Sequence, residues 1–355
     1  MRENQLNRLI PPLLDWFAGA ARDLPWRADK EPYHVWLSEI MLQQTRVEAV
    51  KPYYARFLAA LPDIPALSRC VPETLMKLWE GLGYYSRARN LQKAAQQIMT
   101  EHGGIFPRSY DEIRALAGIG DYTAGAISSI CFDLPEPAVD GNVLRVYTRL
   151  LCDARCTDDQ KVKREIRDTL RLVYADTPQG QRGQLTQALM ELGATVCVPN
   201  GAPHCSACPL AKDCEAGRSG TAAGYPVRKQ KKARRIEYHT VFVLQCGDEI
   251  AVRKRPDTGL LAGLWELPHT EGALDAQSAA DAVSQWKTGA AELLSVRHRT
   301  HIFTHIEWHM TCVHMTVTKK TPCFTWVNAA QLAEETALPT AFRVCLPETL
   351  EMPEG

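Results

Sequence analysis

Apolar side chains recur at three- and four-residue intervals through the first 212 residues, which is the spacing of one face of an α-helix. Glycine or proline marks the breaks between these periodic stretches. The pattern therefore predicts an all-helical region from Leu6 to about Lys212. The clearest predicted helices cover residues 33–47, 73–82, 88–102, 110–117, 123–132 and 161–174.

The pattern changes after residue 235. Short β-branched stretches predict strands, and one amphipathic stretch predicts a helix at 276–287. Residues 216–235 are rich in small side chains and then basic, as in a linker. The predicted strands are 238–245, 249–253 and 308–317. We therefore expect a multidomain α plus α+β protein, with a helical domain over 1–215, a linker over 216–235 and a smaller α+β domain over 236–355.

Length and composition agree with this division. The chain has 355 residues, 45% hydrophobic and 23% charged, which is typical of globular proteins and long enough for two domains. No apolar run approaches the ~20 residues that span a bilayer, and the first residues lack the apolar segment of a secretory signal. We expect a protein of the reducing cytoplasm, without membrane contact, whose twelve cysteines form no disulfide framework.

Charge is unevenly distributed along the chain, although the formal net charge is zero. Residues 226–235 hold six Lys or Arg and no acid, whereas residues 236–355 hold fifteen acids against nine basic residues. A local basic stretch is enough to bind phosphate. Charge alone therefore neither excludes nor establishes a nucleic-acid partner.

Four cysteines lie within eighteen residues in the pattern C-x7-C-x2-C-x5-C. Thiolates at such short spacing bind zinc or an iron–sulfur cluster. A structural zinc site usually has two C-x2-C pairs and this segment has one, but the residue types leave both metals open. We interpret the other eight cysteines as buried apolar residues. The candidate ligands are Cys197, Cys205, Cys208 and Cys214.

The segment LAGIG at 116–120 connects two predicted helices. Gly118 and Gly120 permit a tight turn that leaves backbone N–H groups free at the start of the second helix, where they can bind phosphate. A plain helix–helix turn explains the same residues equally well.

Two carboxylates are candidates for chemistry. Asp140 follows the sequence LPEP and two further residues, so it should lie at or just before a helix start, and a plain N-cap is the simpler interpretation. Glu39 lies on an apolar helical face near Trp36 and Leu42. Burial there should raise the pKa of its carboxyl, as a general acid requires. The alternative for Glu39 is an ordinary charge on a helix surface.

Together these segments resemble the helix-hairpin-helix DNA glycosylases, and within them the MutY-type adenine DNA glycosylases. The resemblance implies a monomeric base-excision repair enzyme, cytoplasmic or associated with a bacterial nucleoid. Its substrate would be double-stranded DNA in which adenine is mispaired with 8-oxoguanine or guanine. The matching segments are LPWR at 24–27, LSEIMLQQT at 37–45, GLGYYSRARNL at 81–91, LAGIGDYTAGAI at 116–127, PAVDGNVLRV at 137–146 and the cysteine cluster.

The same resemblance implies a 4Fe-4S cluster on the four cysteines. The family commonly has six residues between the first two cysteines and this chain has seven, which we interpret as a one-residue loop insertion. Glu39 would protonate the adenine, and Asp140 would stabilise or covalently capture the sugar cation. Tyr122 and Asn142 would support these carboxylates, and Gly118 and Gly120 would bind DNA phosphate.

Other matching positions would contact the substrate after the adenine has been flipped out of the stack. Gln187 would contact that adenine. The sequence Phe303-Thr304-His305 matches a family Phe-Ser-His motif that reads 8-oxoguanine, with Thr304 keeping the hydroxyl and adding a methyl group. Four further positions would surround 8-oxoguanine or wedge beside it: Gln44, Thr45, Leu82 and Tyr84. The full set of expected contacts is Trp26, Arg27, Gln44, Thr45, Leu82, Tyr84, Gln187, Phe303, Thr304 and His305.

The C-terminal part resembles a Nudix-like domain, most clearly in GLLAGLWELP at 259–268. A Nudix hydrolase needs a glutamate-rich helix to bind magnesium, and the predicted helix at 276–287 contains no glutamate. We therefore expect this domain to recognise 8-oxoguanine and not to hydrolyse nucleotides.

Two other functions are weaker. A bifunctional glycosylase/lyase like endonuclease III needs a lysine that forms a Schiff base with the sugar. In that subfamily the lysine follows the hairpin, where this chain has Tyr122, and no lysine occurs between Lys93 and Lys161. A DNA-binding module without catalysis would not need both Glu39 and Asp140. We therefore expect a monofunctional hydrolase.

Overall fold

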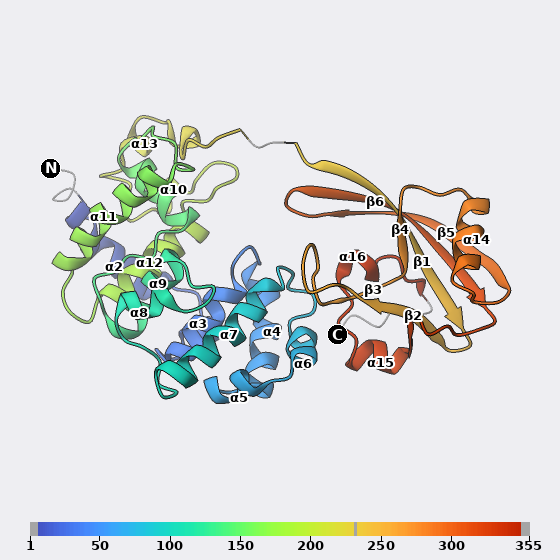
Figure 1. Ribbon diagram of the computed structural model, residues 1–355. Coiled ribbons are helices and arrows are strands. Elements are labelled where there is room, and N and C mark those ends of the chain that lie inside the picture. Colours follow the sequence, from blue (N-terminus) through green and yellow to red (C-terminus); the bar gives the residue numbers. More distant parts are fainter. Residues whose placement is uncertain (1–5, 231–232, 349–355) are drawn as a thin grey trace. The chain divides into compact units, whose positions relative to one another are not determined.

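The computed structural model describes residues 6–230 and 233–348, so the chain ends and Lys231 and Lys232 of the expected linker lie outside the described residues. The chain divides into two compact units (Figure 1). The first unit comprises Met1–Arg69 and Arg89–Gln230, and the second comprises Cys70–Ala88 and Lys231–Gly355. Within the described ranges no helix is long and apolar enough to cross a membrane.

The first unit is built from helices, as the three- and four-residue periodicity predicts. Two expected helices are several residues too long at their C-terminal ends. The helix expected at 33–47 is α3, which ends at Met41, and Gln44 has a φ of 59° in the turn before α4. The helix expected at 73–82 is α6 of the second unit, which ends at Leu78. The helices are α2 (Ile10–Ala20), η1 (Pro25–Arg27), α3 (Pro32–Met41), α4 (Val47–Ala60), α5 (Ile64–Arg69), α7 (Ser86–Glu101), α8 (Tyr110–Ala115), α9 (Asp121–Phe132), α10 (Gly141–Leu150), α11 (Gln160–Asp176), α12 (Arg182–Thr195), η2 (Cys205–Ala207), α13 (Glu215–Arg218) and η3 (Ala222–Gly224).

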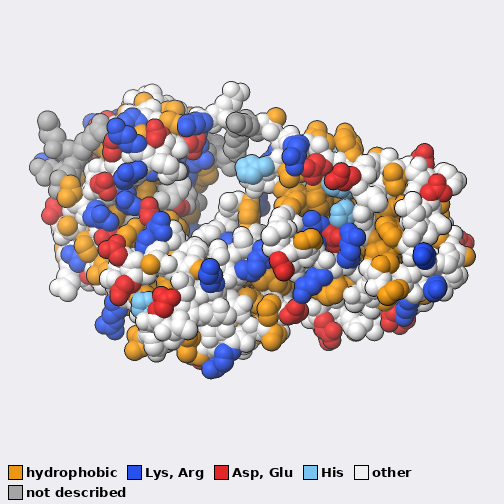
Figure 2. Space-filling model, in the orientation of Figure 1, with side chains coloured by type: hydrophobic (Ala, Val, Ile, Leu, Met, Phe, Trp, Pro, Cys, Tyr) orange, Lys and Arg blue, Asp and Glu red, His pale blue; other side chains and the backbone are white. Residues whose placement is uncertain are grey.

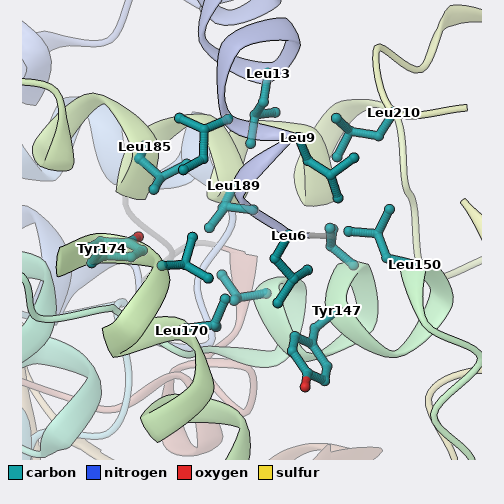
Figure 3. A pocket seen from close by; sticks show the side chains of 14 residues that line it. Leu6, Leu9, Leu13, Tyr147, Leu150, Leu170, Tyr174, Leu185, Leu189 and Leu210 are labelled. Atoms are coloured by element: carbon teal, nitrogen blue, oxygen red, sulfur yellow. The ribbon is translucent and has the colours of Figure 1, made fainter. Parts of the chain in front are cut away.

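Leucine side chains from the N-terminal segment, α10, α11 and α12 point toward one another and form a hydrophobic core in this unit (Figure 3). They surround a small apolar cavity of about 40 Å³. A cavity without polar groups stays dry. This packing fixes the position of α10 and α12. The start of α10 and a different side of α12, which carries Gln187 and Glu191, line the candidate site.

The expected linker differs from the structure over residues 216–230, which pack on the first unit. Ala216 and Ala222 are buried, and Arg149 Nε donates to the carbonyl of Ala222 at 2.9 Å. Further along, Thr157 N–H donates to the carbonyl of Val227, also at 2.9 Å. The small residues therefore serve close packing and turns.

The second unit contains a mixed sheet. Among the described residues, seven strands pair in the order β3-β2-β1-β6-β5, with β4 also paired to β1 and β7 to β2. β1 and β6 are parallel, and the other pairs are antiparallel. The elements are α6 (Pro72–Leu78), β1 (Arg235–Cys246), β2 (Glu249–Lys254), β3 (Trp265–Glu266), β4 (His269–Glu271), α14 (Ala276–Gln285), β5 (Ala291–Ile302), β6 (Ile306–Val317), β7 (Thr325–Asn328), α15 (Ala329–Glu334) and α16 (Thr340–Arg343).

Helices cover both faces of this sheet. Phe242 and Val313 face α14, whereas Val241 and Cys312 face α15 and α16, because successive strand residues point to opposite faces. Cys312 also forms a disulfide with Cys345. This corrects the interpretation of the eight remaining cysteines as buried apolar residues, since Cys312 and Cys345 are the buried ones and they are bonded to each other.

Charged side chains of both signs are interspersed over the first unit on the face that Figure 2 shows. No single-sign field therefore dominates that face. Any binding of phosphate there depends on local groups such as helix ends and individual arginines.

Candidate active site

A cavity of about 220 Å³ lies among α3, α9, α10 and α12 in the first unit. Glu39 comes to it from α3, Tyr122 from the first turn of α9, and Asp140 and Asn142 from the start of α10. The structure therefore brings together the predicted catalytic side chains from three separate segments. Four of the expected substrate contacts also line this cavity: Trp26, Arg27, Thr45 and Gln187.

Glu39 is buried in the cavity wall, with 7% of its surface exposed. The Tyr122 hydroxyl donates a hydrogen bond to Oε2 of Glu39 at 2.7 Å. Burial raises the pKa of Glu39 to about 7, and the nearby Asp140 adds to this rise, whereas the Tyr122 hydrogen bond and the Arg27 cation oppose it. Glu39 can therefore hold a proton at neutral pH, as the apolar face in the sequence predicts.

Asp140 is the N-cap of α10. Its Oδ1 accepts from the backbone N–H of Val143 and its Oδ2 accepts from the side-chain amide of Asn142, both at 2.8 Å. Burial raises the pKa of Asp140, while the hydrogen bonds from Val143 and Asn142 act in the opposite direction. The residue is thus the plain N-cap of the simpler interpretation and also faces the cavity that holds Glu39.

Arg145 fixes the amide that supports Asp140, and the sequence analysis missed it. Its Nη2 donates to Oδ1 of Asn142 at 2.8 Å and to the carbonyl of Gly193 at 2.7 Å. Its Nε donates to the carbonyl of Cys197 at 2.7 Å. An arginine inside the apolar stretch NVLRV is the signal that indicates a buried, fully used cation.

Glu191 is a second residue that the sequence analysis missed. It is fully buried and accepts from Arg22 Nε at 2.6 Å and Arg27 Nη2 at 2.8 Å. Burial alone would raise the pKa of Glu191, but the hydrogen bonds from Arg22 and Arg27 lower it below its ordinary value. Both arginines line the cavity, so Glu191 sets their position. The four-residue spacing from Gln187 on α12 is the available sequence signal.

Of the two hairpin glycines, Gly118 has a backbone conformation that requires glycine and Gly120 does not. Gly118 has a φ of 75°, and a Cβ added there would lie 2.6 Å from Cβ of Asn90. Gly120 is the N-cap of α9 with a φ of −96°, and nothing lies within 4 Å of an added Cβ. At the start of the helix, Asp121 is bound by Arg114 Nε at 2.6 Å and Arg167 Nη1 at 2.7 Å. This balances its charge beside the helix N-terminus.

The four candidate cysteines lie in one loop region. Cys197, Cys208 and Cys214 pack against the helical core, and Cys205 is exposed. Burial raises the pKa of Cys208 to about 11, and the other three cysteines add to the rise because they lie close enough to interact. Within the described part of the chain, no three His, Cys, Asp or Glu side chains converge on one point as a single metal ion would require.

The remaining predicted contacts fall outside the cavity. Tyr84 Oη and Thr304 Oγ1 are 2.8 Å apart in the second unit and form a hydrogen bond; we call these two residues the reading pair. Phe303 packs edge-on against Trp308 with ring centroids 5.1 Å apart. The other three are Leu82, which is buried, and His305 and Gln44, which are exposed.

Two family descriptions match this sequence. Residues 37–171 match the HhH-GPD superfamily of base excision DNA repair proteins, and residues 240–348 match the NUDIX domain. A solved complex of endonuclease III with DNA shares the helical fold, with 24% identity and a TM-score of 0.52 over 62% of this chain and 98% of that chain.

Whole-sequence similarity extends further. The adenine DNA glycosylase of Arabidopsis thaliana is 37% identical over 75% of this chain, which spans about half of that protein, 48% of its length. The adenine DNA glycosylase of Rattus norvegicus is 32% identical over 94% of this chain and 77% of its own length. With a helical repair fold, a Nudix-like unit and this similarity, the chain belongs to the adenine DNA glycosylase family.

Proposed function

We propose that this protein removes adenine mispaired with 8-oxoguanine or guanine in duplex DNA by hydrolysing the N-glycosidic bond. The observation that carries the proposal is the cavity in which Glu39, with a pKa of about 7, lies with the half-buried Asp140. Glycosidic bonds are cleaved by such carboxyl pairs, one protonating the leaving group and one acting at the sugar. Adenine as the leaving base is suggested by the names of the relatives.

The two carboxyls have different partners, which supports different roles. Tyr122 occupies Oε2 of Glu39, so Oε1 is left to present the proton to the flipped adenine. Both oxygens of Asp140 accept hydrogen bonds, which favour its charged form. A carboxylate held in this way stabilises a cationic sugar or captures it covalently. Trp26, Arg27, Thr45 and Gln187 would hold the base in the same cavity.

A bifunctional lyase is the second candidate, because endonuclease III shares the helical fold. Tyr122 stands where that enzyme class would need a lysine, and its hydroxyl is bonded to Glu39. A phenol cannot form a Schiff base with the sugar. We therefore infer that the protein is monofunctional.

DNA binding would involve both units. In the first, the N-terminus of the twelve-residue helix α9 follows Gly118 and Gly120, and a helix N-terminus attracts phosphate. In the second, the net charge of residues 236–355 is negative, so recognition of the opposite base must be local. Thr304 and Tyr84 offer hydroxyls for 8-oxoguanine, with Phe303 and His305 beside Thr304. We also assign Leu82 of the second unit and Gln44 of the first unit to recognition of 8-oxoguanine.

The second unit would read DNA without hydrolysing nucleotides, because α14 carries no glutamate that could bind magnesium. The proposed division of labour is therefore catalysis by the helical part within 1–215 and recognition of 8-oxoguanine by 236–355. The packed residues 216–230 place the beginning of the basic stretch on the first unit.

We also propose that Cys197, Cys205, Cys208 and Cys214 hold a 4Fe-4S cluster. In such a cluster each thiolate binds its own iron, so the four sulfurs need not converge on one ion. Two donors already point at these sulfurs: Arg149 Nη1 lies 3.3 Å from Sγ of Cys197, and the Gly217 N–H lies 3.3 Å from Sγ of Cys214. Such donors stabilise thiolates. Bound there, the cluster would hold the loop to the helical core.

The activity is tested with duplexes that carry adenine opposite 8-oxoguanine, guanine or thymine, under single-turnover conditions. We expect free adenine from the first two duplexes and strand breaks after alkali only. Release of another base, or no release from any duplex, would overturn the proposal. Strand breaks without alkali would favour the lyase.

The cofactor is tested on protein purified without air. We expect iron and acid-labile sulfide with little zinc, and a lower iron content in Cys208→Ser than in the control Cys152→Ser, which lies outside the four. Stoichiometric zinc in place of iron would refute the cluster.

A further inference from the structure

A short stretch of the helical half of the sequence, Cys70–Ala88, belongs to the second unit. It contains α6 and then the turn that leads to Tyr84 of the reading pair. This turn has an unusual backbone: Gly81 has a φ of 97°, Gly83 of 67° and Tyr84 of 47°. A residue other than glycine, such as Tyr84, keeps a positive φ only where the surrounding structure enforces it.

Lys77 and Glu80 connect this stretch to the end of the chain. Lys77 Nζ donates to Oε2 of Glu80 at 2.6 Å and to two carbonyls of the α15 region, Leu332 at 3.1 Å and Thr336 at 3.3 Å. An ammonium group has three protons, and all three are used. Leu332 lies in the short helix α15, where a cation is favourable near the C-terminal carbonyls.

The second oxygen of Glu80 completes this set of contacts. Oε1 accepts from the backbone N–H of Leu338 at 3.0 Å and from the guanidinium of Arg343 in α16. We call Lys77, Glu80 and Arg343 the anchor. The side chains of Lys77, Glu80 and Arg343 are 18%, 13% and 30% exposed, so the anchor is largely shielded from water. Removal of one partner leaves a poorly solvated charge unpaired.

A neighbouring ion pair provides a contrast. Glu73 at the start of α6 and Lys254 of β2 are 2.8 Å apart, and both side chains are about half exposed. Exposed pairs contribute little. Both sets of contacts therefore join the stretch Cys70–Ala88 to the rest of the second unit. The shielded anchor reaches the α15 region and α16, and the exposed pair reaches β2.

We propose that the anchor is a positioning device for base recognition, which holds Tyr84 against Thr304 before DNA binds. This rests on the proposed role of the reading pair at 8-oxoguanine. A contact surface that is already ordered pays less entropy on binding, and small displacements of a recognising group are costly. Arg343 then acts on specificity through Tyr84 without touching the DNA.

The test uses the full-length protein and single-turnover excision of adenine opposite 8-oxoguanine and opposite guanine at matched salt. We expect Arg343→Met to lower the ratio of the two rates about fivefold, the size of one lost base contact. Its rate on adenine opposite guanine should stay within about twofold. Arg343→Lys should retain most of the ratio, and the control Lys254→Met should leave the ratio unchanged.

A double-mutant cycle separates positioning from a general structural role. If the anchor acts through the reading pair, Arg343→Met causes no further loss of the ratio in a Thr304→Val background. Should Arg343→Met be poorly folded, Glu80→Gln replaces it, because the amide oxygen still accepts from Leu338 but lacks the charge.

Two outcomes would overturn the inference: an unchanged ratio, whether or not both rates fall, or independent losses in the double mutant. Failure of the proposed function itself is distinguishable, because the unmodified protein would then excise no adenine or show no preference for 8-oxoguanine.

Discussion

The cavity around Glu39 and the reading pair of Tyr84 and Thr304 use polar groups in opposite ways. Glu39 is 7% exposed, and burial raises the pKa of both Glu39 and Asp140 above the values of these carboxyls in water. Tyr84 is 46% exposed, Thr304 is exposed as well, and they bond to each other.

This difference in burial determines how much each residue can contribute to the rate or to the selectivity of the reaction. Burial moves the pKa of a carboxyl toward neutrality and thereby creates a general acid, whose loss costs about 10²–10⁴ in rate. An exposed hydroxyl offers one hydrogen bond in competition with water, which is worth about 1 kcal/mol. We therefore expect substitutions in the cavity to abolish activity and substitutions in the reading pair to alter selectivity.

The largest effect is expected for Glu39→Gln. Its amide cannot deliver the proton, so adenine release under single-turnover conditions should fall about 10²–10⁴-fold, while duplex affinity in a gel-shift assay stays near that of the unmodified protein. Glu31→Gln, an exposed position at the start of the same helix, is the control. A rate above roughly a tenth of the original would end the assignment of Glu39 as the acid.

The same variant tests whether the pKa of Glu39 is raised in the folded protein. The folded protein binds the Glu39 proton more tightly than the unfolded chain, since its pKa of about 7 exceeds the ordinary 4.5. This stabilising contribution is complete below pH 4.5 and is lost as the pH rises through about 7. Relative to the unmodified protein, Glu39→Gln should therefore gain about 1–3 kcal/mol between pH 5 and pH 8 in denaturant unfolding. If the difference in unfolding free energy between the variant and the unmodified protein does not change with pH, the pKa of Glu39 is not raised by folding.

Backbone geometry in the first unit gives a third test. Gly118→Ala should lower the free energy of unfolding by about 1–2 kcal/mol, because alanine resists a φ of 75° and its Cβ meets Asn90. Gly120→Ala has room for a Cβ and an ordinary φ, so it is the matched control. Equal denaturation midpoints for the two variants would contradict the geometry of the hairpin.

The smallest effect is expected for Thr304→Val, which keeps the shape of the side chain and removes the hydroxyl. Activity opposite 8-oxoguanine should fall about fivefold more than activity opposite guanine, which corresponds to about 1 kcal/mol. Thr325→Val, at an exposed position of β7, should leave this ratio unchanged. A loss of several orders of magnitude would show that the two regions do not differ as proposed.

Local patterns predicted the elements well where local forces decide them. Helix 123–132 lies within α9 at Asp121–Phe132, strand 308–317 lies within β6 at Ile306–Val317, and the division into a helical and an α+β part is confirmed. The strand β5 was not predicted, because its alternating polar residues include few apolar signals beyond Leu293, Leu294 and Val296.

Such local patterns could not predict which residues contact each other across long distances in the sequence. Glu191 on α12 is paired with Arg22 and Arg27, which lie more than 160 positions earlier in the chain, and periodicity reports only on the nearest turn of helix. The composition of residues 216–230 predicted a linker, whereas backbone carbonyls of this segment accept hydrogen bonds from Arg149 and Thr157. Composition describes the residues of a segment and not the donors that reach it.

The second unit is made of two separate stretches of the chain, and this has consequences for truncation and for recombination between relatives. A stop codon after residue 230 would not remove a module, because Lys77 and Glu80 would remain while the carbonyls of Leu332 and Thr336, the Leu338 N–H and Arg343 were lost. Recombination that exchanges the C-terminal segment between relatives must likewise join a compatible pair at 77 and 80 to the incoming residue at 343. Across relatives, these three positions should therefore change together, with charge reversals in one stretch matched in the other.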